Sequence, residues 1–172
     1  MIVYMDVFTG DEMYNDSFTI RQEGCMDIID AKFIEKREED FGIASNADED
    51  AEEGAAGEGL DAPGVEKVID VVEGAQLVQQ DGFTKSAYMA HIKGYFKHMI
   101  EHLTATNPER VAGFKTEAQA FVKKVIENFK DCTFYSGKSM DVDDGCLIVS
   151  IYHDGTNPVF YFFRDGMKHE RY

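Results

Sequence analysis

The sequence predicts an α+β fold in which a pair of helices is inserted between β-rich segments, and three observations predict it. Apolar residues alternate in "IVYMDVF" (residues 2–8), which is typical of a strand. Between residues 84 and 130 they recur at steps of three and four, which is typical of amphipathic helices. Aromatic and β-branched runs return after residue 131, so strands flank one helical block. The length suits a single domain, residues 1–172.

The N-terminal part is predicted to hold strands separated by turns. After the first strand, "TGDEMYND" (residues 9–16) is rich in turn formers and predicts a polar turn. "SFTIRQ" (residues 17–22) and "CMDIIDAKFIEKR" (residues 25–37) predict further strands, with a break near Gly24. "VEKVIDVVEGAQLVQ" (residues 65–79) is rich in β-branched residues and also predicts a strand.

Residues 38–64 are predicted to form a long, mobile acidic loop. From Glu38 to Asp61 the chain has ten acidic residues and no lysine or arginine. Such a segment buries too little apolar surface to offset the entropy of ordering its backbone, about 1–2 kcal/mol per residue. A solvated loop and a specific acidic docking motif are both open as interpretations.

Residues 84–130 are predicted to form an antiparallel helical hairpin. Thr84 suits the N-cap of the first helix, and Asn107, which precedes a proline, suits the cap of the second. Gly113 is expected to weaken or kink the start of the second helix. The spacing of "TEAQ" (residues 116–119) is that of a capping box, which would restart it.

Strands and one acidic turn are predicted in the C-terminal part. The predicted strands cover residues 132–137, 145–152 and 158–164. The turn "DVDDG" (residues 141–145) resembles part of a calcium loop but lacks the glutamate of an EF-hand. A hairpin turn is the simpler interpretation. Weak calcium binding stays open, with candidate ligands Asp141, Asp143 and Asp144.

Charge and cysteine content limit the partners and the compartment. The net charge of −16 predicts no nucleic-acid partner, because phosphate groups would be repelled. No apolar run approaches the roughly 18 residues of a membrane span, so we expect no membrane insertion. The N-terminus lacks the pattern of a signal peptide, and three cysteines without CxxC spacing indicate a reducing interior. Together these features predict a cytoplasmic protein.

The sequence contains no motif typical of a catalytic site, and we expect the protein not to be an enzyme. It has no glycine-rich phosphate-binding run, no GxSxG and no HExxH. His98 and His102 have the spacing of a metal-binding pair, and His91 lies near the same helical face, but no third ligand is evident. We therefore expect an exposed polar face there, and no cofactor beyond weakly bound calcium.

The predicted hairpin is basic in an otherwise acidic chain. Residues 85–130 contain eight lysines and arginines against four glutamates. A basic strip along the hairpin is predicted from Lys93, Lys97, Lys123 and Lys124. It is either a solvated face or a surface that binds an acidic protein partner.

Five separated strings resemble the translationally controlled tumour protein family: "MIVYMDVFTGDEMYND", "FTKSAYMAHIKGYFKHM", "NPERVAGFK", "ENFKDCTFYSGKSM" and "FFRDGMKHE". The resemblance implies a small β-tent of mostly antiparallel sheets, with a helical hairpin and a long mobile acidic loop. It also implies a cytoplasmic adaptor of growth and cytoskeleton that binds calcium weakly, tubulin, elongation factor and anti-apoptotic Bcl-family proteins. The alternative that it implies is nucleotide exchange on a small Rheb-like GTPase, which Glu12 would contact. In either case the hairpin lysines would belong to a partner-binding surface.

Two of the departures from the family pattern bear on charge and modification. Asp48 stands where members carry a serine, which puts phosphorylation at that position in doubt. Lys138 follows Gly137 where members usually carry a glutamate. This charge reversal is expected to weaken any acidic surface near it.

Overall fold

The computed structural model describes residues 1–37, 65–152 and 157–172. The predicted acidic loop, residues 38–64, lies outside the described residues. The chain divides into two compact units. The larger one contains residues 1–32 and 71–172, and of the smaller one residues 33–37 and 65–70 are described.

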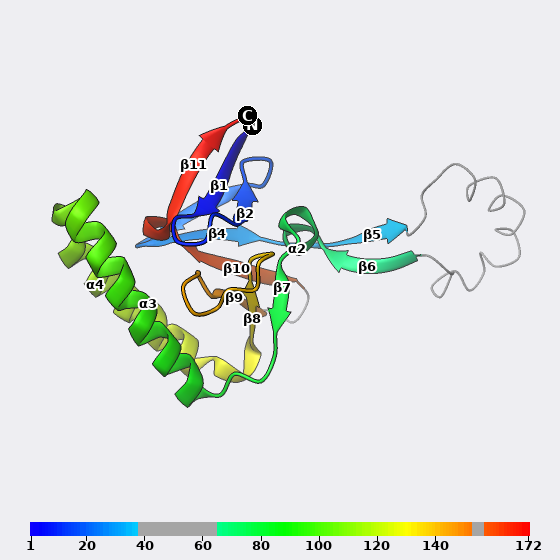
Figure 1. Cartoon of the computed structure of the whole chain (residues 1–172). Coiled ribbons are helices and arrows are strands. Elements are labelled where there is room, and N and C mark those ends of the chain that lie inside the picture. The colour runs from blue at the N-terminus through cyan, green and yellow to red at the C-terminus, as the bar shows by residue number, and fades with distance from the viewer. Residues whose placement is uncertain (38–64, 153–156) are drawn as a thin grey trace, which may run out of the picture. The chain divides into compact units, whose positions relative to one another are not determined.

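Two antiparallel sheets form the β-structure of the larger unit (Figure 1). The three-stranded sheet has the order β11 (Met167–Arg171), β1 (Ile2–Asp6), β2 (Glu12–Asn15). The six-stranded sheet has the order β3 (Ile20–Glu23), β4 (Met26–Asp30), β10 (Pro158–Phe163), β9 (Ile148–Tyr152), β8 (Cys132–Ser136), β7 (Val78–Gln80). The α+β class with mostly antiparallel sheets is therefore confirmed.

Strands β1 and β11 join the two ends of the described chain. Ile2 lies opposite Arg171 in an antiparallel register. Beyond them, the Met1 ammonium donates to the Tyr172 carbonyl oxygen at 2.8 Å, and the Tyr172 N–H donates to the Met1 carbonyl oxygen at 2.7 Å. The three-stranded sheet thus combines the first and the last residues of the chain.

The segment 25–37 is two strands and not one. Strand β4 lies between β3 and β10, and four successive residues, Met26 to Ile29, are buried because both faces of this strand are covered. The strand ends before Ala31, whose N–H donates to the Pro158 carbonyl oxygen at 3.0 Å. The chain then enters β5 (Phe33–Arg37) of the smaller unit, so the prediction of one continuous strand is wrong.

The smaller unit is a two-stranded antiparallel ribbon in its described part. Strand β5 pairs with β6 (Val65–Ile69), and Phe33 lies opposite Ile69. Phe33 and Ile34 are among the more exposed large apolar side chains of the described chain.

A helix interrupts the strand predicted over residues 65–79. Residues 70–75 form α2 (Asp70–Ala75), in which Val71 and Ala75 are buried one helical turn apart. The helix ends at Gln76, whose φ of 57° is left-handed, and the Leu77 N–H donates to the Val72 carbonyl oxygen at 3.0 Å. This is a Schellman-type helix end. The helix was not predicted, because the β-branched residues of this segment favour a strand.

The predicted helical hairpin is confirmed. Helix α3 (Lys85–Thr106) begins after Thr84, whose hydroxyl oxygen accepts from the Ala87 N–H at 3.0 Å as an N-cap. A 3₁₀ turn, η2 (Pro108–Arg110), leads into α4 (Val111–Glu127), and a second, η3 (Phe129–Asp131), follows α4. Figure 1 shows the two helices side by side.

Helix α4 does not restart at the predicted capping box. It runs without a break from Val111, and the Thr116 hydroxyl donates to the Ala112 carbonyl oxygen at 3.3 Å, as in a helix interior. A β-carbon at Gly113 would lie 2.6 Å from an Arg110 nitrogen, so glycine here makes room for that side chain. The prediction of a restart at residues 116–119 is therefore wrong.

Aromatic contacts join the hairpin to the six-stranded sheet. Phe163, at the end of β10, lies 5.5–6.2 Å, between ring centroids, from four aromatic residues of the two helices: Tyr95, Phe96, Phe114 and Phe121. Phe163 is 1% exposed, so this cluster lies in the core. Edge-to-face and tilted ring pairs of this kind add to the burial of apolar surface.

Candidate functional site

Glu12 opens strand β2 at the edge of the three-stranded sheet, and its side chain is half-buried. The two residues after it, Met13 and Tyr14, are both 1% exposed. Opposite them, the pairing register of β1 shifts between Tyr4 and Met5. Such a bulge changes the direction in which the neighbouring side chains point. The prediction of a polar turn is wrong for residues 12–15, which form this strand.

A buried hydrogen bond fixes β2 to the six-stranded sheet. The Tyr14 hydroxyl donates to Asp27 Oδ2 at 2.5 Å, and its ring stacks on Tyr4 with centroids 4.7 Å apart. Burial and the Asp27 carboxylate raise the pKa of Tyr14. The hydroxyl therefore remains protonated and acts as a donor, and the backbone that carries Glu12 has a fixed position.

The loop before Glu12 is organised around Asp6, which is fully buried. Its carboxylate accepts from the Phe8 N–H at 2.8 Å and from the Cys146 N–H at 2.7 Å. Its backbone accepts from the Gly10 N–H at 2.8 Å and donates to the Asp11 carbonyl oxygen at 2.9 Å. Burial raises the pKa of Asp6, and the N–H donors partly offset this effect.

The Asp11 carboxylate holds the turn of residues 137–140. Asp11 Oδ2 accepts from the Ser139 hydroxyl at 2.6 Å and from the Ser139 N–H at 3.2 Å. A β-carbon on Gly137 would lie 2.5 Å from the same oxygen. Only glycine therefore fits where this turn passes Asp11, and the next residue, Lys138, lines the same hollow as Glu12.

These elements enclose a hollow of about 400 Å³ that we call the Glu12 hollow. It is lined by Gly10, Asp11, Glu12, Glu73, Gly74, Ala75, Gln76 and Lys138. Loop, strand, helix α2 and the 137–140 turn each contribute to it. The lining brings three carboxylates together with one ammonium group, so it suits a charged protein surface.

The four predicted lysines of the hairpin do not form one uniform strip. Lys93 and Lys97 on α3 and Lys123 on α4 are exposed. Lys124 is half-buried: its Nζ donates to the Tyr161 hydroxyl at 3.2 Å and lies 4.8 Å from the centre of that ring. Lys124 thus contacts the sheet, and three lysines face solvent.

The three histidines of α3 are half-buried, and two of them contact the 141–145 turn. His91 Nε2 lies 2.6 Å from the Val142 carbonyl oxygen, and His98 Nδ1 lies 3.9 Å from Asp144 Oδ1. The rings of His98 and His102 pack against Phe8, with centroids 6.0 Å and 5.7 Å away. Because Nε2 of His91 must donate to a carbonyl oxygen, its Nδ1 carries no proton in the neutral ring. Burial lowers the pKa of His91.

The 141–145 turn does not fit a calcium shell as it stands. Asp141 Oδ1 accepts from the Asp144 N–H at 3.0 Å, and the Asp144 carboxylate faces His98. Over residues 1–37, 65–152 and 157–172, no three His, Cys, Asp or Glu side chains converge to hold a metal ion. A hairpin turn accounts for these contacts.

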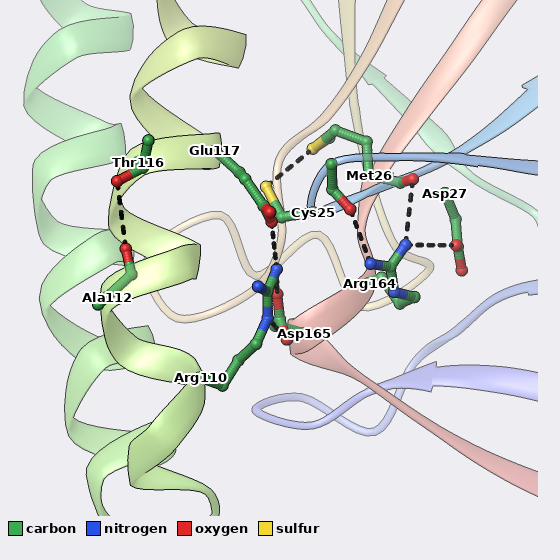
Figure 2. A network of polar contacts seen from close by, with 10 residues as sticks. Cys25, Met26, Asp27, Arg110, Ala112, Thr116, Glu117, Arg164 and Asp165 are labelled. Atoms are coloured by element: carbon green, nitrogen blue, oxygen red, sulfur yellow. Dashed lines mark hydrogen bonds and ion pairs between the residues drawn. The ribbon is translucent and has the colours of Figure 1, made fainter.

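A polar network between the hairpin and the strands was not predicted from the sequence (Figure 2). Arg110 makes a two-point ion pair with Asp165, with N–O distances of 2.9 Å and 3.0 Å, and also contacts Glu117 at 2.5 Å. Asp165 lies in η4 (Arg164–Gly166) before β11. The network therefore fastens the turn of the hairpin to the end of β10.

The second part of this network lies around Arg164 and buried Asp27. Arg164 donates to the Gly24 carbonyl oxygen at 2.7 Å, and its guanidinium lies 3.5 Å from Asp27 Oδ1. Because Asp27 Oδ2 accepts from Tyr14, this carboxylate connects the hairpin side of the sheet to strand β2. The sequence feature that could have indicated this buried contact is Asp27 itself, an aspartate within an otherwise apolar strand.

Comparison with known proteins identifies the family. The family model described as translationally controlled tumour protein matches residues 1–168. The chain belongs to this family. A homologue from Yarrowia lipolytica is 37% identical over 173 residues, with 99% of each chain covered. A homologue from Schizosaccharomyces pombe is 37% identical over 177 residues, with 100% of each covered.

Solved structures of translationally controlled tumour proteins share the fold. The p23fyp protein of Schizosaccharomyces pombe superposes with a TM-score of 0.79 at 36% identity, and 100% of both chains is covered. The NMR structure of the Caenorhabditis elegans protein gives a TM-score of 0.67 at 27% identity, with 100% and 99% covered. The β-tent with a helical hairpin, implied by the resemblance, is therefore confirmed. None of the described helices is long and apolar enough to cross a membrane.

Proposed function

We propose that this member of the translationally controlled tumour protein family is a cytoplasmic adaptor of growth and cytoskeleton that acts by contact and not by catalysis. The observation that carries the proposal is the pair of surfaces on its larger unit. One is the Glu12 hollow, whose lining carries three carboxylates and one ammonium group. The other is the hairpin, from which Lys93, Lys97 and Lys123 extend into solvent. Surfaces of opposite charge favour different partners, which suits a multi-partner protein.

The Glu12 hollow is proposed as the surface for a small Rheb-like GTPase. Glu12 stands on a strand fixed by the Tyr14–Asp27 hydrogen bond and beside a turn fixed by Asp11. Because this backbone is already ordered, binding a partner here costs little backbone entropy. Glu12 is therefore expected to contribute strongly to the affinity for the GTPase.

Binding of the GDP-loaded GTPase to wild type, Glu12→Ala and Glu127→Ala tests this proposal. Glu127 is the control, because it is an exposed carboxylate on the last turn of α4. We expect Glu12→Ala to weaken binding roughly 10-fold or more, which corresponds to about 1.4 kcal/mol, while Glu127→Ala leaves it unchanged. Equal affinities for all three proteins would refute the role of Glu12.

Nucleotide exchange through Glu12 is the alternative function. The favouring observation is that Glu12 lies at a hollow and not on a flat sheet edge, so a partner loop has room to enter. A carboxylate inserted near the phosphates or the magnesium ion of a GTPase would weaken their mutual attraction. The rate of GDP release separates the two functions: an adaptor leaves it at the spontaneous level, and an exchange factor raises it in a Glu12-dependent way.

The hairpin is proposed as the surface for tubulin, which is an acidic partner. Changing Lys93, Lys97 and Lys123 together to glutamate should abolish co-sedimentation with microtubules, and the loss should resemble the effect of raised salt. Lys124→Gln is the matched control, because Lys124 is engaged by Tyr161. Elongation factor and Bcl-family proteins are further proposed partners, to be tested by pull-down from a cognate lysate.

Weak calcium binding is proposed for the acidic turn that carries Asp141, Asp143 and Asp144. The Asp141 and Asp144 groups would have to leave their present contacts, and this cost is consistent with low affinity. An NMR titration should shift amides of this turn in the wild type and not in a variant with all three residues changed to asparagine. Equal shifts in a variant that lacks residues 42–62 would exclude the acidic loop as the site.

A further inference from the structure

We infer that Met140 and Lys138 select the partner that docks at the Glu12 hollow. The inference rests on the proposed function and names the chemistry of that partner. Its surface has an apolar recess for Met140, an acidic group opposite Lys138 and a basic group opposite Glu12. A GTPase with only basic residues in this region would be a poor partner.

The turn that carries both side chains is held in place before any partner arrives. The Met140 N–H donates to the Gly137 carbonyl oxygen at 2.9 Å, which closes the turn. Ser139 makes two hydrogen bonds to Asp11, the residue before Glu12. Lys138 and Met140 flank Ser139 in the chain, so the same contacts hold the turn that carries both, and Lys138 itself lines the hollow.

Met140 is an unusual residue for its backbone conformation and its exposure. Its φ of 61° lies in the left-handed region, which disfavours residues with a β-carbon and suits glycine or asparagine. Its side chain is 58% exposed, although methionine is apolar. The fold itself would be served better by glycine at this position. A methionine here suits contact with a partner, because its flexible thioether adapts to irregular apolar recesses.

Lys138 determines which charges the partner must present. It is the basic residue of the hollow lining, among Asp11, Glu12 and Glu73. A purely basic partner would be attracted by the carboxylates and repelled by Lys138. A partner with an acidic group opposite Lys138 and basic groups opposite the carboxylates is attracted by every charge of the hollow. A partner that places a like charge opposite any of them is repelled there, which gives specificity.

The first test replaces Met140 by glycine and, separately, by asparagine in the full chain. Both residues suit the left-handed backbone, so thermal stability should stay the same or rise. Affinity for the GDP-loaded GTPase should fall roughly 10- to 100-fold, as expected when one buried apolar side chain is lost from an interface. Glu127→Ala is again the control, because Glu127 is an exposed side chain on α4, and its loss should not change the affinity.

The second test compares Lys138→Gln with Lys138→Glu. Glutamate should weaken binding more than glutamine, and the difference between them should shrink when the salt concentration rises. A tighter complex with Lys138→Glu would overturn the inference, since the partner would then present a basic group at this point.

The outcomes separate this inference from the proposed function. If Glu12→Ala weakens binding while the Met140 and Lys138 variants bind like wild type, the inference is wrong and the Glu12 proposal stands. If wild type does not bind the GTPase at all, both are wrong. Loss of affinity in the Met140 variants, with stability retained, supports the inference.

Discussion

Arg110→Ala should destabilise the protein far more than Arg21→Ala, although both arginines form two-point ion pairs with an aspartate. Arg21 donates to Asp30 at 3.1 Å and 2.9 Å, and Arg110 donates to Asp165 at 2.9 Å and 3.0 Å. The pairs therefore match in geometry. They differ in burial, and Arg110 has Glu117 as a second partner. The side chains of Arg21 and Asp30 are 49% and 64% exposed, and those of Arg110 and Asp165 are 23% and 12% exposed.

The size of the difference follows from this contrast in solvent exposure. An exposed ion pair contributes about 0–1 kcal/mol, because water and salt screen it. Removing one partner of a buried pair costs about 3–5 kcal/mol, since the other charge is left without compensation. The Arg110 site is partly buried, so we expect a loss of about 2–3 kcal/mol. For a chain of this size, each kcal/mol lowers the midpoint temperature of thermal unfolding by about 2–4 °C, so we expect this temperature to fall by about 4–12 °C.

Urea denaturation followed by circular dichroism measures both free energies of unfolding, and a double-mutant cycle of Arg110→Ala with Asp165→Ala isolates the pair. Hydrogen exchange at the turn between α3 and α4 should also quicken in Arg110→Ala, because this pair fastens the turn to the sheet. Equal losses of stability in Arg110→Ala and Arg21→Ala would refute the argument that burial, and not pair geometry, sets the contribution.

Three further predictions concern other parts of the fold. Thr84→Ala should cost about 1 kcal/mol of stability, because the N-cap bond to α3 is lost, while Thr84→Ser should keep most of it. Tyr14→Phe should cost about 1–3 kcal/mol, because it leaves the buried Asp27 carboxylate without its donor. His91→Gln should flatten the pH dependence of stability. Burial lowers the pKa of His91 below 6.5, so the unfolded chain binds the proton more readily, and wild type loses stability as the pH falls from about 7 to 5.

Chemical denaturation checks the first two predictions, and a series of urea curves between pH 5 and 7.5 checks the third. A loss in Thr84→Ser as large as in Thr84→Ala would show that the hydroxyl cap is not the cause. A fully stable Tyr14→Phe would mean that Arg164 alone compensates Asp27. If stability changes with pH in the same way in wild type and His91→Gln, groups other than His91 cause the loss of stability at low pH.

Local signals were sufficient for helices α3 and α4 and for most strands. The threonine hydroxyl of Thr84 and the three- and four-residue spacing behind it predicted α3 correctly, because both act within a few residues of the chain. The alternation in residues 2–6 likewise predicted β1. For the candidate site, the resemblance led to Glu12, and the sequence alone gave no reason to prefer it to its acidic neighbours.

Features that depend on distant partners were not predictable. Asp6 lies on an alternating strand, but its burial depends on Cys146, 140 residues away. Gly137 reads as an ordinary turn residue until the structure places Asp11 against it. Helix α2 was missed because its β-branched residues favour strands, and only the packing of Val71 and Ala75 decides for a helix.

The pairing of β1 with β11 has a consequence for how the protein is made. Strand β1 leaves the ribosome long before its neighbour β11, because Asp6 pairs with Met167 and Ile2 with Arg171. At 5–20 residues per second, the nascent β1 waits roughly 10–30 s for this neighbour. During synthesis one edge of β1 has no native partner, so the three-stranded sheet is completed only after β11 has emerged, and contacts this distant in sequence form slowly.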